Sequence, residues 1–159
     1  MIVRVQKCDL IKCLNVIRHS FATVAVELGL TEENCPGHTA FMKLDRLERD
    51  FEFGNPMYAY VKDNSYAGFV SLRPMEDSCE MKLLCVLPEY RHDGIGRELV
   101  DHAKRIASGE FKRNKMTIGV IDESAVLKNW YANLGFTQTG THKFEHLPFT
   151  VGFMEMPLP

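Results

Sequence analysis

Two arginines and two glycines within residues 91–97, in the order Arg-x-x-Gly-x-Gly, have the composition of an anion-binding loop. The apolar run before them predicts a strand that ends at Leu87. The loop then covers residues 88–94, and the following sequence predicts a helix that begins near Gly96. A connection of this kind between a strand and a helix is where backbone can approach a phosphate closely.

Three features of this loop would hold a negatively charged group. Gly94 and Gly96 have no Cβ, so a ligand can reach their N–H groups at contact distance. A helix N-terminus adds unpaired N–H donors and about half a positive charge. Arg91 and Arg97 add charged side chains. The segment therefore predicts a site for a phosphate or pyrophosphate.

The spacing separates this loop from two other phosphate-binding motifs. The dinucleotide fingerprint has three glycines, and the P-loop ends in Lys-Ser or Lys-Thr, and neither pattern is present here. Loops with two glycines are common, so a strand-to-helix turn without any ligand is the alternative interpretation.

Size and composition are typical of one soluble domain over residues 1–159. The hydrophobic content is 45% and the charged content 25%, both ordinary for a globular protein. A net charge of −2 argues against a nucleic-acid partner, which would be bound through phosphate contacts. Residues 10–30 are apolar but interrupted by charged side chains, so we expect no membrane span and no membrane partner.

The cysteines and histidines favour a cytoplasmic protein without a metal. The five cysteines are odd in number, form no Cys-x-x-Cys pair and follow no secretory leader, which predicts reduced thiols. The six histidines lack the spacing of metal ligands, so we expect no bound metal.

Hydrophobic periodicity predicts the element order β-α-α-β-β-β-α-β-α-β-β. The strand at residues 116–121 is apolar on both faces, which predicts burial on both sides. Helices are expected over residues 10–28, from Thr39 to about residue 53, from near Gly96 to about residue 106, and over residues 124–134. The other strands are expected at residues 2–5, 57–61, 66–72, 80–87, 136–141 and 150–156.

Three segments in this order resemble the GNAT family of N-acetyltransferases. Residues 91–96 are similar to motif A of that family, and residues 122–136, which end in Tyr-x-x-x-Gly-Phe, are similar to motif B. Residues 66–72 look like its usual third strand. The resemblance covers essentially the whole chain and implies an α/β fold of the α+β kind. We expect a mixed, mostly antiparallel sheet of six or seven strands with splayed central strands, flanked by about four helices.

The resemblance also implies acetyl-coenzyme A as co-substrate. In this family motif A binds the pyrophosphate, and the strand before it pairs with the pantetheine arm where the central strands splay apart. Many members have an asparagine that touches the cofactor at the position of Ser124. The serine departs from this family pattern, and it is included among the cofactor-binding residues by position alone. The cofactor-binding residues implied here are Leu84, Cys85, Val86, Arg91, His92, Asp93, Gly94, Ile95, Gly96, Arg97 and Ser124.

Tyr131 is the candidate general acid, because it matches the motif B tyrosine residue for residue. A phenol has a pKa near 10 and can donate a proton to a leaving sulfur. The alternative is a core tyrosine, since Tyr131 lies on the apolar face of its predicted helix.

Glu80 is the candidate general base, because it lies on the strand that carries the family's base. The period of two predicts that Glu80 shares a face with Leu84 and Val86. The alternative is an exposed strand carboxylate. Other candidate bases are His38, His142 and His146, each interpreted first as a surface histidine.

The reaction implied is direct attack of an amine on the thioester in a ternary complex. A route through acetylated Cys85 is conceivable, but a small buried apolar residue is the simpler interpretation of that cysteine. In the family the acceptor site is built from the first two helices and the last loop, here residues 34–41 and 142–149. Their aromatic residues and histidines, with Glu145, suit a small polar amine, and a short peptide almost as well.

The sequence therefore predicts an acetyl-CoA-dependent N-acetyltransferase acting on a primary amine of a small molecule. One alternative is a peptide or protein N-acetyltransferase, and another is a non-catalytic domain that binds or senses acyl-CoA. A third is an interaction protein that uses exposed aromatic residues. Sheet edges would also allow a homodimer. The aromatic residues concerned are Phe41, Phe51, Trp130 and Phe149.

Overall fold

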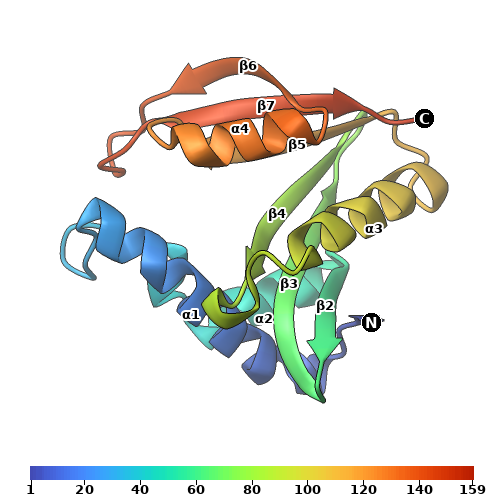
Figure 1. Ribbon diagram of the computed structural model, residues 1–159, viewed down its shortest axis with the longest axis horizontal. Coiled ribbons are helices and arrows are strands. Elements are labelled where there is room, and N and C mark those ends of the chain that lie inside the picture. Colours follow the sequence, from blue (N-terminus) through green and yellow to red (C-terminus); the bar gives the residue numbers. More distant parts are fainter.

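Seven strands form a single mixed sheet in the order β1-β2-β3-β4-β5-β7-β6 (Figure 1). The computed structural model describes all residues from Met1 to Pro159. Only β4 and β5 are parallel neighbours, so the expected mixed, mostly antiparallel sheet and the predicted element order are confirmed. The strands are β1 (Ile2–Arg4), β2 (Met57–Lys62), β3 (Ser65–Pro74), β4 (Cys79–Val86), β5 (Lys115–Ile121), β6 (Thr137–His142) and β7 (Val151–Pro157).

The sheet opens between its two parallel strands. Pairing of β4 with β5 is limited to Cys79 with Met116 and Glu80 with Thr117. Beyond these pairs β4 stays with β3 and β5 stays with β7, so the two strands diverge as Figure 1 shows. The predicted splaying of the central strands is confirmed, and the backbone edge of β4 that faces β5 is left open from Met81 onward.

A β-bulge interrupts β4 at the start of this open stretch. Phe69 of β3 is opposite Cys85, whereas Ser71 is opposite Lys82, so β4 has one residue more than β3 between these pairs. Leu83 occupies the bulge with a φ of 58°, a left-handed conformation that is rare for a residue with a Cβ.

The bulge reverses the alternation of side chains along β4. Met81 before it, and Leu84 and Val86 after it, all pack against the same core. Glu80 therefore points to the opposite face from Leu84 and Val86, and the expectation that these residues share a face is wrong. The period of two holds only for a continuous strand, and one inserted residue shifts it.

Four α-helices cover the sheet. They are α1 (Leu10–Leu28), α2 (Leu44–Phe53), α3 (Ile95–Gly109) and α4 (Ala125–Asn133). Short 3₁₀ turns, η1 (Lys7–Asp9), η2 (Thr39–Phe41) and η3 (Pro88–Tyr90), precede α1, α2 and α3. No helix combines the length and the apolarity that crossing a bilayer would require.

Helix bounds agree with the predicted ones to within one residue, except at the start of the second helix and at the end of α3, which extends to Gly109. Gly29 ends α1 and Gly54 ends α2, both in the left-handed conformation. The single helix expected from Thr39 is wrong, because buried Met42 takes an extended ψ of 137° and separates η2 from α2. Burial of the Met42 side chain in the core accompanies this break.

Two hydrophobic cores lie on opposite faces of the sheet. The larger contains buried residues of α3, α4 and the strands, and the smaller contains residues of α1, α2, β2, β3 and β4. On β5, Met116, Ile118 and Val120 are buried, whereas Thr117 and Gly119 are not. The expectation that β5 is buried on both faces is wrong, because α1 packs on β3 and β4 and leaves the other face of β5 uncovered.

His102 of α3 makes stability depend on pH. Its ring packs edge-on against Tyr58 with centroids 4.5 Å apart, and its Nε2 is buried without a hydrogen-bond partner. Burial lowers the pKa of His102, and nearby Arg105 lowers it further. The unfolded chain takes up this proton at an ordinary pKa of about 6.5, so folding becomes less favourable as pH falls below that value.

We therefore expect a lower melting temperature at pH 5.5 than at pH 7.5, and a smaller difference in His102→Gln. Circular dichroism melts at both pH values measure this. His146→Gln, at an exposed histidine, is the matched control and should leave the difference unchanged. An unaltered pH dependence in His102→Gln would show that the buried imidazole is not responsible.

Candidate active site

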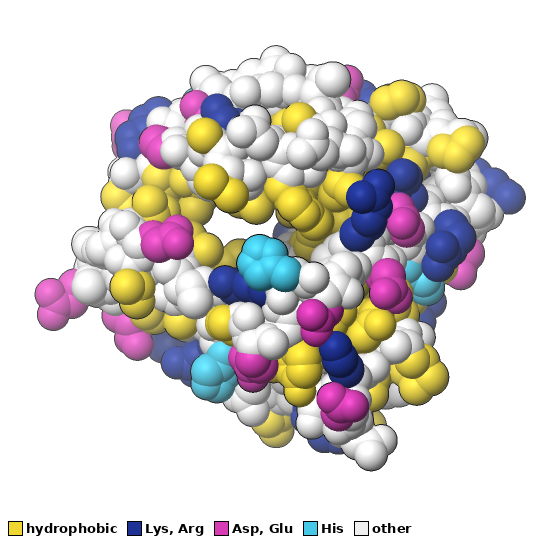
Figure 2. Space-filling view, in the orientation of Figure 1, with side chains coloured by type: hydrophobic (Ala, Val, Ile, Leu, Met, Phe, Trp, Pro, Cys, Tyr) yellow, Lys and Arg dark blue, Asp and Glu magenta, His cyan; other side chains and the backbone are white.

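An opening lies between the two halves of the molecule. Figure 2 shows it between the layer of β5, β6, β7 and α4 and the part that contains α1, with apolar side chains along its rim. It corresponds to the region where β4 and β5 diverge. The arginine and glycine loop follows β4 directly, so it stands at the open end of the divergence.

The loop presents a run of free backbone donors. The N–H groups of residues 92–97 donate no hydrogen bond to any protein acceptor, whereas Arg91 N–H is already bonded to the Pro88 carbonyl. His92 and Gly94 have positive φ values of 70° and 81°, whereas Asp93 between them does not. Alternation of left-handed with other backbone conformations turns successive N–H groups toward one concave side. With the N-terminus of α3 behind them, these groups form a site suited to a phosphate.

The two arginines of the loop have different roles. Arg97 is exposed and makes no hydrogen bond or ion pair, so its charge is available to a ligand. Arg91 instead donates to the Val86 carbonyl at 3.1 Å, the Thr23 hydroxyl at 3.2 Å and the Ser20 carbonyl at 2.8 Å. Three of its donors are thus occupied within the protein, and its guanidinium joins the end of β4 to α1.

Arg91→Ala is expected to loosen α1. The variant loses charge-assisted hydrogen bonds to α1. Because the Arg91 side chain is exposed, these bonds are partly screened by solvent, and together they stabilise the fold by only about 1–2 kcal/mol. Urea unfolding should show this loss, and amide hydrogen exchange should become faster within residues 16–24. Arg97→Ala is the matched control, because that arginine has no partner to lose. Equal stability of the two variants would contradict the bracing role.

Asp93 and Gly96 are held by contacts on either side of the loop. Asp93 accepts a hydrogen bond from Lys62 Nζ at 2.7 Å, which ties the loop to the β2–β3 hairpin. A Cβ on Gly96 would lie 3.3 Å from the indole of Trp130 on α4. The glycine spacing therefore serves packing against Trp130 as well as access to the backbone.

Cys85 is unsuited to covalent catalysis. It is 8% exposed, and burial raises the pKa of its thiol to about 12. The thiol therefore stays protonated at neutral pH and is a poor nucleophile. This supports the interpretation of Cys85 as a small buried residue, while its neighbours Leu84 and Val86 pack against the larger core.

Tyr131 is buried, yet its hydroxyl is unpaired. The residue is 7% exposed and its ring contacts those of Trp130 and Phe136 edge-on, at centroid distances of 4.9 and 5.6 Å. The hydroxyl makes no hydrogen bond and is not among the polar atoms sealed from solvent. Burial, with a smaller effect of Cys85, raises the pKa of Tyr131 above its usual value. The phenol therefore stays protonated throughout the neutral range.

Glu80 lies where β4 and β5 still pair, at the closed end of the divergence. It is half-buried and forms no ion pair. Because of the bulge it faces the side of the sheet that carries α1 and α2. It is thus separated from the Leu84 and Val86 side chains but lies on the side where α1 could bring an acceptor.

Ser124 is engaged as a helix cap. Its hydroxyl accepts a hydrogen bond from Leu127 N–H at 3.3 Å, as expected for the N-cap of α4. Among the candidate bases, His142 and His146 are exposed, as interpreted from the sequence. His38 is 8% exposed and buried, so its interpretation as a surface histidine is wrong.

Ser20 of α1 was not singled out by sequence reasoning. It is 2% exposed, its hydroxyl has no partner and lies against the Cys85 thiol, and its carbonyl accepts from Arg91. The available signal was position, because Ser20 follows Ile17 by three residues and thus lies on the apolar face of α1.

The loop between β6 and β7 closes one side of the opening. Leu147 and Phe149 from this loop pack against a small core formed by the end of α1 and the segment before α2. Phe21 of α1 and Phe41 of η2 belong to the same cluster. The two segments expected to bind the acceptor are therefore brought together.

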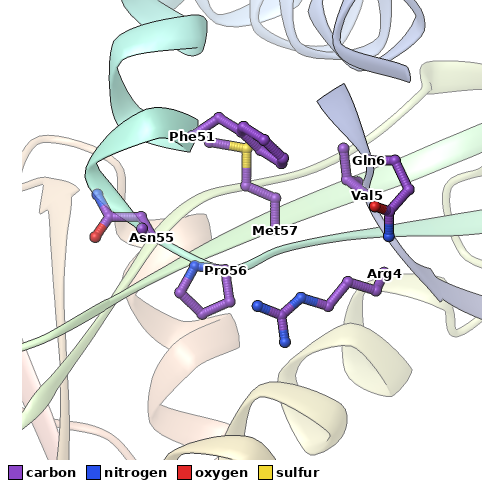
Figure 3. Close-up of a pocket in the computed structure, with 8 residues that line it drawn as sticks. Arg4, Val5, Gln6, Phe51, Asn55, Pro56 and Met57 are labelled. Atoms are coloured by element: carbon purple, nitrogen blue, oxygen red, sulfur yellow. The ribbon is translucent and has the colours of Figure 1, made fainter. Parts of the chain in front are cut away.

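A separate shallow pocket of about 170 Å³ lies beside the edge strand β1 of the sheet (Figure 3). It is formed between β1 and the turn after α2, with the Arg4 side chain near Pro56. Since β1 is the edge strand beyond β2 and β3, this pocket is distinct from the opening beside β4.

Residues 54–138, more than half of the chain, match the acetyltransferase (GNAT) domain family. The chain therefore belongs to the GNAT family of N-acetyltransferases, and the resemblance read from the sequence is confirmed. A curated relative, the peptidyl-lysine N-acetyltransferase YjaB of Salmonella typhimurium, is 29% identical over 106 residues. That alignment spans 66% of this chain and 66% of the relative.

Solved structures share the fold at low sequence identity. The ribosomal-protein-S18-alanine N-acetyltransferase of Escherichia coli superimposes with a TM-score of 0.79 at 14% identity, covering 99% of this chain and 93% of the other. The PaiA N-acetyltransferase of Thermoplasma acidophilum, solved in complex with coenzyme A, also gives 0.79, at 20% identity and with 99% and 98% coverage.

Proposed function

We propose that this protein transfers the acetyl group of acetyl-CoA to a primary amine of a small molecule, by direct attack within a ternary complex. The observation that carries the proposal is the run of unpaired N–H groups at residues 92–97, at the open end of the divergence between β4 and β5. These groups, with Arg97, would hold the pyrophosphate, and the open edge of β4 would pair with the pantetheine arm.

The proton transfers are assigned to groups on the two halves of the molecule. The amine nitrogen forms the new C–N bond as the C–S bond of the thioester breaks. Tyr131 gives its hydroxyl proton to the departing sulfur, which leaves as a thiol, and the proton that the nitrogen sheds on becoming an amide restores the phenol through solvent. Glu80, directly or through water, takes the proton that the amine must lose before it attacks.

Glu80→Gln is expected to lower kcat/KM about tenfold at neutral pH, since water can replace the carboxylate in part. In the pH profile of kcat/KM, the acidic limb should shift or disappear in this variant, whereas the affinity for acetyl-CoA should stay unchanged. The profile is measured by thiol release at saturating acetyl-CoA. If the bell-shaped profile of the wild type persists in the variant, another group or water is the base.

A small acceptor is favoured by the closure of one side of the opening. Contacts of Leu147 and Phe149 with the α1 and η2 cluster limit the access of a large folded surface. A peptide or protein acceptor is the second candidate, because the relatives named above modify peptidyl-lysine and an alanine of a ribosomal protein.

The testing experiment is a screen of amines and short peptides with acetyl-CoA, with free thiol as readout. Release that depends on a small amine, and falls in Tyr131→Phe, is the expected result. Release only with peptides would favour the second candidate. Binding of acetyl-CoA without release in any case would indicate a non-catalytic acyl-CoA-binding domain.

A further inference from the structure

His38 is a buried polar residue in an otherwise apolar wall. Its ring lies between Phe21 of α1 and Phe41 of η2, in edge contacts with centroids 6.2 and 6.1 Å apart. Leu147 and Phe149 of the β6–β7 loop pack on the same cluster, which places His38 near the segments proposed to bind the acceptor. Figure 2 shows apolar surface along the rim of the opening.

The hydrogen bonding of His38 fixes its tautomer. Nδ1 accepts a hydrogen bond from Ala40 N–H at 3.2 Å, so the proton of the neutral ring lies on Nε2. Burial, and then the charge of Arg46, lowers the pKa of His38, which keeps the ring neutral at physiological pH.

The Nε2–H group is a donor without an acceptor. It makes no hydrogen bond in the protein, although the residue is more than nine-tenths buried, and Nε2 is not among the atoms sealed from solvent. A ligand that displaces solvent from this donor must supply an acceptor, or the donor is left unpaired at a cost in free energy. A ligand oxygen that reaches this cluster would supply one.

The charged side chain that acts on His38 is a cation. Arg46 adds positive charge beside His38, where its Nη1 donates to the Gly37 carbonyl at 3.1 Å. Placing an unpaired ammonium against phenylalanine and leucine side chains without a compensating anion is costly.

We propose that the acceptor is a primary amine on an apolar, preferably aromatic, skeleton that also bears a carbonyl or carboxylate oxygen, and that His38 Nε2–H donates to this oxygen. This rests on the proposed function. His38 is then a specificity-determining residue and takes no part in proton transfer. Polyamines, which present further ammonium groups to this wall, are poor substrates.

Three amines test this, with thiol release as readout: phenylalaninamide, phenethylamine, which lacks the carbonyl, and spermidine. The wild type should prefer phenylalaninamide to phenethylamine and should use spermidine least. The variant His38→Asn keeps an acceptor for Ala40 N–H, but its side chain is too short to place a donor where Nε2 lies. It should lose about tenfold in kcat/KM for phenylalaninamide, the effect of one hydrogen bond, and nothing for phenethylamine.

Several results would overturn the assignment. A wild-type preference for spermidine would overturn it even if the variant failed to fold. Equal losses of kcat/KM for phenylalaninamide and phenethylamine in His38→Asn would also overturn it. Acetyl-CoA affinity and the thermal midpoint of the variant report whether it is folded. If acetyl-CoA binds but no amine or peptide is acetylated, the proposed function itself fails, and the acceptor assignment fails with it.

Discussion

Replacing Tyr131 with phenylalanine is expected to lower kcat for acetyl transfer at least about hundredfold, the usual contribution of a positioned general acid. The hydroxyl makes no hydrogen bond in the protein, so its removal should cost little stability and leave the affinity for acetyl-CoA near the wild-type value. Steady-state kinetics and isothermal titration with acetyl-CoA measure the two quantities separately.

Tyr58→Phe is a matched control for this experiment. Tyr58 is likewise buried and its hydroxyl is unpaired, but it packs against His102 of α3 rather than beside β4. The control should retain wild-type turnover. If Tyr131→Phe also does so, the phenol is a core residue, and the proton reaches the sulfur from elsewhere.

Gly94→Ala is expected to weaken acetyl-CoA binding about thirtyfold. Gly94 has a φ of 81°, and a Cβ there would meet no other atom, so the penalty is conformational rather than steric. An alanine in the left-handed region costs about 1–2 kcal/mol. The loop can relieve this strain by turning its N–H groups away from their common direction. The cofactor would then lose charge-assisted hydrogen bonds worth about 2 kcal/mol, which corresponds to the expected thirtyfold loss of affinity.

Gly54→Ala separates this effect from general destabilisation. Gly54 also lies in the left-handed region, with a φ of 102° and open space around its Cβ position, but it ends α2. Both variants should melt at similarly reduced temperatures, whereas only Gly94→Ala should bind acetyl-CoA weakly by titration. Similar binding by the two variants would argue against a phosphate site built from the backbone of this loop.

Much of the architecture followed from local patterns. The helix expected over residues 10–28 has those bounds in the structure, and the helix expected over residues 124–134 is present as α4. The order of elements and the family then implied the splayed sheet. These predictions succeed because periodicity and caps act over a few neighbouring residues.

The errors arose where distant segments meet. An extra residue at Leu83 depends on pairing with β3, so a strand pattern alone placed Glu80 on the wrong face. The Arg91 side chain has partners on α1, far away in sequence, that its spacing in the loop could not indicate, and its contact with a phosphate stays a prediction. Burial of His38 likewise depends on the packing of α1 with η2.

The hydrogen bonds of Arg91 have an evolutionary consequence. One guanidinium connects the loop proposed for the cofactor with the Ser20 carbonyl and Thr23 hydroxyl of α1, the helix proposed to face the acceptor. We therefore expect that the two regions proposed to bind the substrates do not diverge independently. In an alignment of relatives, positions 23 and 91 should covary, and changes in acceptor choice that move α1 should coincide with replacement of the arginine.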